Sequence, residues 1–332
     1  MKGALFWKKQ KTGVKCSLCP RGCLIPEGRT GFCRVRKNVR GVLHSLNYGR
    51  LCSVNADPIE KKPLSHFAPG TSCLSIATVG CNFACQYCQN WEISQAKEVF
   101  GEEFTPEQVV ETAQTMGLPG IAYTYVEPTI FYEFALDTMK IAKKQGVYNV
   151  WVSNGYTSLE AIKRMSRYLD AINIDYKGDE KFYKKLCLVP DMEPIRKAML
   201  LYKRKGVWLE ITNLLVPGWN DKREQVEDMC RWIVKNLGPE TPLHFSRFFP
   251  HYKMTDVPPT PSKTLDTAYE TAKAAGLSYV YVGNVPGDRR ESTFCPKCGA
   301  LVIERLGFGA GKVNRKCPEC GHKIPLAGLE WK

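Results

Sequence analysis

Short apolar runs alternate with amphipathic stretches between residues 73 and 283. Six runs, and a seventh candidate, have the length and the β-branched and aromatic content of buried strands. They are CLSIATV (73–79), GIAYTYV (120–126), YNVWVSN (148–154), AINIDYK (171–177), VWLEITNLLV (207–216), PLHFSRFF (242–249) and SYVYVG (278–283). Between them, apolar residues recur at helical spacing. This alternation predicts parallel βα units.

Start signals accompany two of the predicted helices. Thr105 is an expected N-cap, with Pro106 at the first helical position and Gln108 completing a capping box. Ser262 is expected to cap the helix that follows it. Six or seven consecutive units favour an α/β fold, a partial or full TIM-like (β/α)6 barrel, with a doubly wound open sheet as the alternative. Either arrangement binds ligands at the carboxyl ends of the strands.

The pattern is different at both ends of the chain. We predict three parts: a Cys-rich N-terminal metal-binding segment (1–60), a core (61–291) and a zinc-ribbon-like C-terminal module (292–332). No apolar run approaches the 18 residues of a membrane span, and the first residues lack the core of a signal peptide. We therefore expect a cytoplasmic protein with no membrane contact.

Eleven of the 15 cysteines fall into three clusters, which indicates metal binding in a long chain without a signal peptide. The CPKCG and CPECG motifs are typical of zinc knuckles and contain Cys295, Cys298, Cys317 and Cys320. The N-terminal cluster offers four thiolates to zinc or to an auxiliary iron–sulfur cluster, and spacing does not separate the two: Cys16, Cys19, Cys23 and Cys33. We interpret Cys52, Cys73, Cys187 and Cys230 as buried apolar residues.

The middle cluster has only three members, Cys81, Cys85 and Cys88, in GCNFACQYCQN directly after the first predicted strand. A cluster of four irons needs four outer ligands, so three cysteines leave one iron able to bind a substrate or cofactor. The alternative is that His66 or Cys73 closes an ordinary zinc or electron-transfer site.

The Cys-x3-Cys-x2-Cys spacing, with Tyr87 just before the last cysteine, resembles the signature of the radical SAM superfamily. The resemblance implies a 4Fe-4S cluster on these cysteines and S-adenosylmethionine at the open iron. It further implies reductive cleavage of this cofactor to methionine and a 5′-deoxyadenosyl radical, which abstracts hydrogen from a substrate. A low-potential electron donor of the ferredoxin or flavodoxin type would supply the electron.

Polar residues end the next three predicted strands and resemble further elements of that family. Glu127 stands where the family has Gly-Gly-Glu, although Tyr125 and Val126 replace the glycines. Its carboxylate would accept from the cofactor ammonium. Ser153 and Asn154 resemble a ribose-contacting Thr-Asn-Gly element. Asp175 and Lys177 resemble the Asp-Leu-Lys element of glycyl-radical-enzyme activases, which lines cofactor and substrate, and His251 is a further candidate. Each of these residues also has an ordinary structural interpretation. Glu127 would be a carboxylate at a helix N-terminus, Asn154 part of a turn, and Asp175 and Lys177 an ion pair on one face.

Motifs over nearly the whole chain resemble the radical SAM member of the AmmeMemoRadiSam system, a group similar to pyruvate formate-lyase activating enzyme. They include CSLCPRGC, DPIEKKPLSHFAPG (57–70), AYTYVEPTIFYE, and YVYVGN before the CPKC knuckle. This resemblance implies an activating-enzyme-like oxidoreductase that acts on a partner protein or a small molecule, with Memo-like and AMMECR-like proteins as candidate partners.

Two other functions are compatible with parts of the sequence. The zinc knuckles and the formal net charge of +14 suggest an RNA-modifying or nucleic-acid-binding protein. The chain has no RNA-recognition motif and no concentrated basic arm, so we do not expect a nucleic-acid partner. The other alternative is an iron–sulfur electron carrier with no cofactor at the open iron.

Overall fold

A central parallel sheet dominates the protein, whose structure is a computed structural model describing residues 1–331. The sheet has eight strands in the order β16-β15-β14-β13-β12-β11-β9-β8. Neighbours from β9 to β16 pair in parallel, and β8 pairs antiparallel with β9. The strands are β8 (Ser53–Pro58), β9 (Ser72–Ala77), β11 (Gly120–Tyr123), β12 (Tyr148–Ser153), β13 (Ala171–Asp175), β14 (Trp208–Leu215), β15 (Leu243–Arg247) and β16 (Val280–Gly283).

The seven parallel strands lie within, or within one residue of, the seven runs predicted from the apolar pattern. Their order in the sheet follows their order in the chain, so each connection advances by one strand in the same direction. A doubly wound sheet reverses its strand order at a switch point, so that alternative is wrong. Within residues 1–331, β16 pairs with neither β8 nor β9, and the sheet is open. A curved partial barrel stays a prediction.

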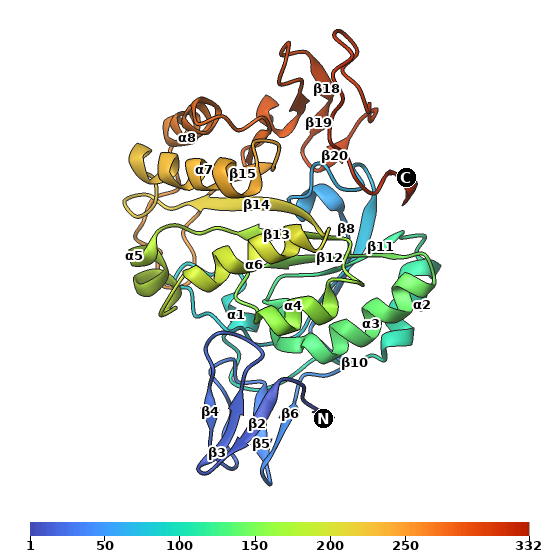
Figure 1. Ribbon diagram of the computed structural model, residues 1–332, viewed down its shortest axis with the longest axis vertical. Coiled ribbons are helices and arrows are strands. Elements are labelled where there is room, and N and C mark those ends of the chain that lie inside the picture. Colours follow the sequence, from blue (N-terminus) through green and yellow to red (C-terminus); the bar gives the residue numbers. More distant parts are fainter. Residues whose placement is uncertain (332) are drawn as a thin grey trace.

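Helices connect the parallel strands (Figure 1). The longer ones are α2 (Pro106–Thr115), α3 (Tyr132–Lys144), α4 (Leu159–Met165), α6 (Glu193–Arg204), α7 (Arg223–Leu237) and α8 (Ser262–Ala274). Short helical turns are α1 (Trp91–Ser94), α5 (Glu180–Phe182), η1 (Ile59–Lys61), η2 (Pro128–Phe131), η3 (Tyr183–Cys187), η4 (Arg289–Glu291) and η5 (Leu329–Trp331). Within residues 1–331, none of the helices has the length and apolar character that crossing a membrane requires.

Of the two helix N-caps predicted from the sequence, the structure contains one and lacks the other. The capping box at Thr105 is confirmed, because its hydroxyl accepts from the backbone N–H of Gln108 at 3.2 Å and the Gln108 side chain accepts in return at 2.8 Å. The prediction for Ser262 is wrong. Pro261, with an extended backbone, occupies the cap position, and Ser262 is already the first residue of α8.

The N-terminal part forms two small three-stranded antiparallel sheets, β2-β3-β4 and β1-β6-β5. Their strands are β1 (Lys2–Gly3), β2 (Trp7–Gln10), β3 (Gly13–Cys16), β4 (Leu24–Ile25), β5 (Arg36–Val39) and β6 (Val42–Ser45); β7 (Arg50–Leu51) pairs with β10 (Glu102–Glu103). We call residues 1–45 the N-terminal module. Arg36 anchors it to α3 through an ion pair with Glu133 at 3.0 Å, with both side chains buried. Strand β8, inside the range predicted for this segment, belongs to the central sheet.

The C-terminal module lies at the opposite end of the central sheet (Figure 1). It contains β17 (Thr293–Phe294), β18 (Leu301–Ile303), β19 (Arg305–Leu306) and β20 (Gly309–Ala310). Arg305 donates to the carbonyl of Ser65 at 2.6 Å, in the loop that precedes β9. The carboxyl ends of the parallel strands, where we expect ligands, therefore lie on the side away from this module.

Candidate active site

The three-cysteine loop follows β9 at the carboxyl edge of the sheet. Gly80 opens the loop with φ of +97°, and its N–H donates to Ile93 at 2.9 Å. Within the loop, the backbone N–H of Phe83 donates to the sulfur of Cys81 at 3.4 Å. The sulfur of Cys88 lies 3.3 Å from the hydroxyl of Ser94 in α1. These local contacts orient the first and the last cysteine of the loop.

The cysteines of this loop are not gathered around a single ion. Within residues 1–331, only the C-terminal cysteines bring three or more metal-ligating atoms within 4.8 Å of one another. The wider spacing of Cys81, Cys85 and Cys88 suits a cluster in which each thiolate binds a different iron. The two fourth ligands considered from the sequence are badly placed. Cys73 lies at the opposite end of β9, and both ring nitrogens of His66 are engaged, with Pro325 and Tyr281.

Glu127, Ser153 and Asn154 meet, as the strand-end pattern predicted. The buried carboxylate of Glu127 accepts from the Ser153 hydroxyl at 2.9 Å and from the backbone N–H of Asn154 at 2.7 Å. It also accepts from the backbone N–H and the hydroxyl of Thr129, at 3.0 and 2.6 Å. Burial raises the pKa of Glu127 above its usual range, and these hydrogen bonds offset part of the rise.

Asn154 connects this carboxylate to the three-cysteine loop. Its side-chain amide donates to the side-chain oxygen of Asn82 at 2.8 Å, and Asn82 directly follows Cys81. Asn82 in turn donates to the carbonyl of Tyr156 at 3.0 Å. The ends of β9, β11 and β12 are thus joined by one buried hydrogen-bond network.

Asp175 and Lys177 form an ion pair at 2.8 Å beside the second cysteine of the loop. Burial lowers the pKa of Lys177, but the charges of Asp175 and Cys85 outweigh burial and raise the pKa well above its usual range. The ammonium group lies 5.9 Å from the ring centre of Tyr87. The Lys177–Asp175 ion pair therefore lies beside the three-cysteine loop.

Cys187 is a neighbour of the loop that the sequence interpretation missed. It ends the turn η3, is fully buried, and lies 3.4 Å from the hydroxyl of Tyr87. Backbone bonds join the two segments, from Gln86 to Leu186 at 2.9 Å and from Ala84 to Cys187 at 3.3 Å. The signal that could have identified Cys187 is its position soon after the Asp175 and Lys177 element.

His251 is less integrated into the site. Its segment contacts the three-cysteine loop, since the backbone N–H of Lys253 donates to the carbonyl of Gln86 at 2.9 Å. Tyr252 has a φ of +55° and stacks on Trp91 with ring centres 5.1 Å apart. The imidazole of His251 makes no hydrogen bond within residues 1–331. A role in cofactor binding stays a prediction for this residue.

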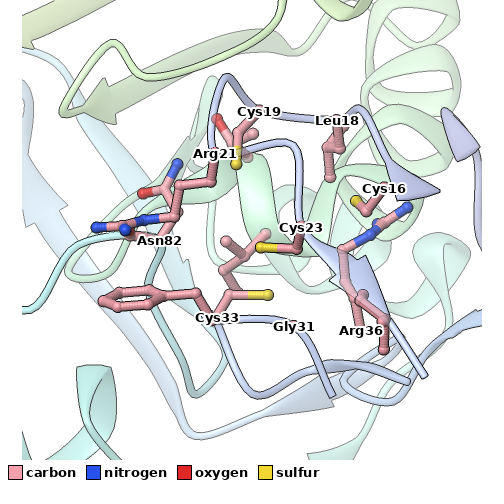
Figure 2. Close-up of a pocket in the computed structure, with 13 residues that line it drawn as sticks. Cys16, Leu18, Cys19, Arg21, Cys23, Gly31, Cys33, Arg36 and Asn82 are labelled. Carbon is pink, nitrogen blue, oxygen red and sulfur yellow. The ribbon is translucent and has the colours of Figure 1, made fainter. Parts of the chain in front are cut away.

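Within each of the two four-cysteine clusters, the fold brings the four cysteines close to one another. In the C-terminal module, the sulfurs of Cys295 and Cys320 lie 3.6 Å apart and those of Cys298 and Cys317 lie 3.5 Å apart. Tetrahedral coordination with bonds of about 2.3 Å requires sulfur separations of about 3.8 Å, so one metal ion fits there. The N-terminal cysteines line a common cavity (Figure 2): Cys16, Cys19, Cys23 and Cys33.

Similarity to known proteins agrees with this geometry. An uncharacterized protein of Methanocaldococcus jannaschii is 49% identical over 98% of this chain and 99% of its own length. The pyruvate formate-lyase-activating enzyme of Clostridium pasteurianum is 25% identical over 48% of this chain and 67% of its own. The solved structure of a radical SAM methyltransferase from Sphaerobacter thermophilus is similar in fold, with a TM-score of 0.52 at 16% identity over 70% of each chain.

A family model described as the radical SAM superfamily matches residues 75–233. The matched region runs from β9 into α7 and contains the three-cysteine loop, Glu127 and the Asp175–Lys177 pair. Strand order, loop position and this match agree. Residues 75–233 therefore form a radical SAM domain, and members of this superfamily use a 4Fe-4S cluster and S-adenosylmethionine.

Proposed function

We propose that this protein is a radical SAM oxidoreductase with activating-enzyme-like chemistry. It would cleave S-adenosylmethionine reductively, and the resulting 5′-deoxyadenosyl radical would abstract hydrogen from a partner protein or a small molecule. The supporting observation is that the three-cysteine loop shares a sheet edge, and one hydrogen-bond network, with the polar residues that follow β11 and β12.

Cys81, Cys85 and Cys88 would hold the 4Fe-4S cluster. This cluster supplies one electron and an iron without a protein ligand, at which the cofactor binds. Lys177 lies beside these cysteines, and its ammonium group, which is paired with Asp175 at 2.8 Å, would offset part of the negative charge of the thiolates. The Tyr87 ring, which is nearly inaccessible to solvent, packs against Phe182 and helps to exclude water from the cysteines.

Glu127 would bind the cofactor ammonium, and Ser153 and Asn154 its ribose. A carboxylate offers about four lone-pair directions, and four protein groups already donate to Glu127. The ammonium group can bind only if one of these donors gives up its place. Glu127 thus also acts as a positioning residue for Ser153 and Asn154.

We further propose the partners that the family resemblance implies. A ferredoxin- or flavodoxin-type protein would supply the electron, and Memo-like and AMMECR-like proteins are candidate partners, one of which could donate the hydrogen atom. We also propose zinc for the C-terminal site, because four thiolates at tetrahedral separations are its usual structural environment.

The test is anaerobic reconstitution with iron and sulfide, followed by reductant and S-adenosylmethionine. We expect 5′-deoxyadenosine and methionine from the wild-type chain, and neither from Cys85→Ala. Cys230→Ala is the matched control, since this buried cysteine lies in α7 away from the site. No 5′-deoxyadenosine from a preparation with an intact cluster contradicts the proposal. Deuterium transfer from labelled candidate substrates into 5′-deoxyadenosine would identify the hydrogen donor.

A further inference from the structure

The N-terminal module contains a second cysteine site, apart from the three-cysteine loop. Cys16 ends β3, Cys19 and Cys23 lie in the connection to β4, and Cys33 lies shortly before β5. Their sulfurs surround the cavity shown in Figure 2, and none is in a disulfide. The backbone bond from Cys16 to Cys23, 2.9 Å long, holds the two ends of the connection together. Four thiols therefore converge from three segments of the chain.

The spacing of these thiols differs from that of the C-terminal site. A single tetrahedral ion needs sulfurs about 3.8 Å apart, and the C-terminal pairs at 3.5 and 3.6 Å are close to this value. No three sulfurs of the N-terminal site lie within 4.8 Å of one another. A polynuclear cluster holds its thiolates farther apart than a single ion does, since each binds a different iron. The N-terminal sulfurs are thus spaced more widely than those of the C-terminal site.

The walls of the cavity also suit a charged cluster. Leu18, Ile25 and Ile130 contribute apolar surface, and the cations of Arg21 and Arg36 line the same cavity. Arg21 offsets part of the net negative charge of a cluster held by four thiolates, whereas Arg36 is already paired with Glu133, and apolar walls limit access by water. We infer that the N-terminal module binds an iron–sulfur cluster through Cys16, Cys19, Cys23 and Cys33.

This second site directly adjoins the three-cysteine loop. A β-carbon on Gly80 would lie only 2.7 Å from the carbonyl oxygen of Cys33. Arg21 donates to the carbonyl of Asn82 at 2.5 Å and to that of Leu188 at 2.6 Å. Gly80 and Asn82 flank Cys81, so the two cysteine sites share a wall.

Because the two sites share a wall, the second cluster is assigned a redox role. This assignment rests on the proposed function. A low-potential one-electron donor reduces the N-terminal cluster. This cluster returns to its oxidised state as it passes the electron to the cluster on Cys81, Cys85 and Cys88. One electron enters and one leaves, with no bond made or broken.

Metal analysis of the anaerobically reconstituted full chain tests the site. We expect about eight irons and about one zinc per chain, and about four irons with unchanged zinc in the double variant Cys19→Ala, Cys23→Ala. The triple variant with alanine at residues 81, 85 and 88 should keep about four irons whose EPR signal does not respond to S-adenosylmethionine. Cys230→Ala should match the wild type. About four irons and about two zincs in the wild type overturn the inference, and the triple variant decides it if the double variant fails to fold.

A spectroscopic test addresses the redox role. The fully reduced wild type should show EPR broadening from two interacting clusters, which neither variant shows. With a photoreduced flavin as donor, reduction of the S-adenosylmethionine-responsive cluster should slow at least several-fold in the double variant. An unchanged rate overturns the redox role and leaves the site in place. Eight irons without 5′-deoxyadenosine would instead contradict the proposed function alone.

Discussion

At the scale of single residues, Glu127 combines a negative charge with burial. Glutamine at this position replaces one acceptor oxygen by an NH2 group, which then faces a buried donor such as the N–H of Asn154 or Thr129. An unpaired buried donor costs about 1–3 kcal/mol. We predict that Glu127→Gln lowers the free energy of unfolding in urea by this amount and weakens S-adenosylmethionine binding measured by calorimetry.

Ser153→Ala is the control for this variant, because it removes one donor and leaves the charge of Glu127 in place. It should weaken binding less than Glu127→Gln does. Unchanged binding in Glu127→Gln, together with lower stability, would mean that the carboxylate only positions its neighbours.

Cys187 provides a second prediction at this scale. It lies beside Tyr87, so it could be mistaken for a fourth cluster ligand. We predict that Cys187→Ala retains the iron and the absorbance of the cluster on the three-cysteine loop, whereas Cys85→Ala loses them. Loss of that cluster from Cys187→Ala would show that the site is closed by four protein ligands, and the idea of an open iron would fail.

At the scale of elements, the strands were predictable and their surroundings were not. The seven parallel strands produce local apolar runs, and Thr105 produces a local capping signal, so both are visible in the sequence. Strands of the N-terminal module are two to four residues long and depend on distant partners such as Glu133, 97 residues from Arg36. Cys187 reaches the three-cysteine loop through backbone contacts about 100 residues apart in sequence. Such contacts leave no periodic signal.

The same limit applies to the candidate site. The polar residues at the strand ends could be found because strand ends converge at one edge of a parallel sheet. The saturation of Glu127 by four donors, two of them from Thr129, could not be found, because it depends on side-chain orientation.

The loop that begins at Gly80 offers a prediction at this scale. Alanine there incurs the left-handed backbone cost of about 1–2 kcal/mol and also collides with Cys33. Gly117 has a φ of +66°, and a β-carbon added to it would meet nothing within 4 Å, so Gly117→Ala incurs only the backbone cost. We predict that Gly80→Ala is the less stable variant in urea unfolding and retains less iron. Equal stability of the two variants would contradict a tight contact between loop and module.

At the scale of the whole molecule, His66 joins the central sheet to the C-terminal module. Its imidazole is fully buried and neutral, donating to the carbonyl of Pro325 at 2.7 Å and accepting from the hydroxyl of Tyr281 at 2.6 Å. Burial lowers the pKa of His66 to about 4 from its ordinary value of 6.5, although the charge of Glu210 opposes the shift. The unfolded chain therefore takes up a proton at a higher pH than the folded chain does.

This difference makes stability depend on pH. The difference in His66 pKa contributes about 3 kcal/mol to the free energy of unfolding above about pH 6.5. This contribution is lost as the pH falls toward 4. We predict that the free energy of unfolding decreases between pH 7.5 and pH 5, and decreases less in His66→Gln, whose amide can make both hydrogen bonds. Iron and zinc contents followed in the same samples separate this effect from metal loss. Parallel pH profiles for the two proteins would contradict it.

The long-range contacts of the N-terminal module have a consequence for biosynthesis. The side chain of Arg21 is held by the carbonyl of Leu188, 167 residues later in the chain. At translation rates of 5–20 residues per second, this partner follows roughly 8–33 seconds after Arg21. The thiols of residues 16 to 33 leave the ribosome before the other cysteines and before this partner is made. The earliest cysteines thus belong to a module whose contacts are completed only after the chain has been synthesised past Leu188.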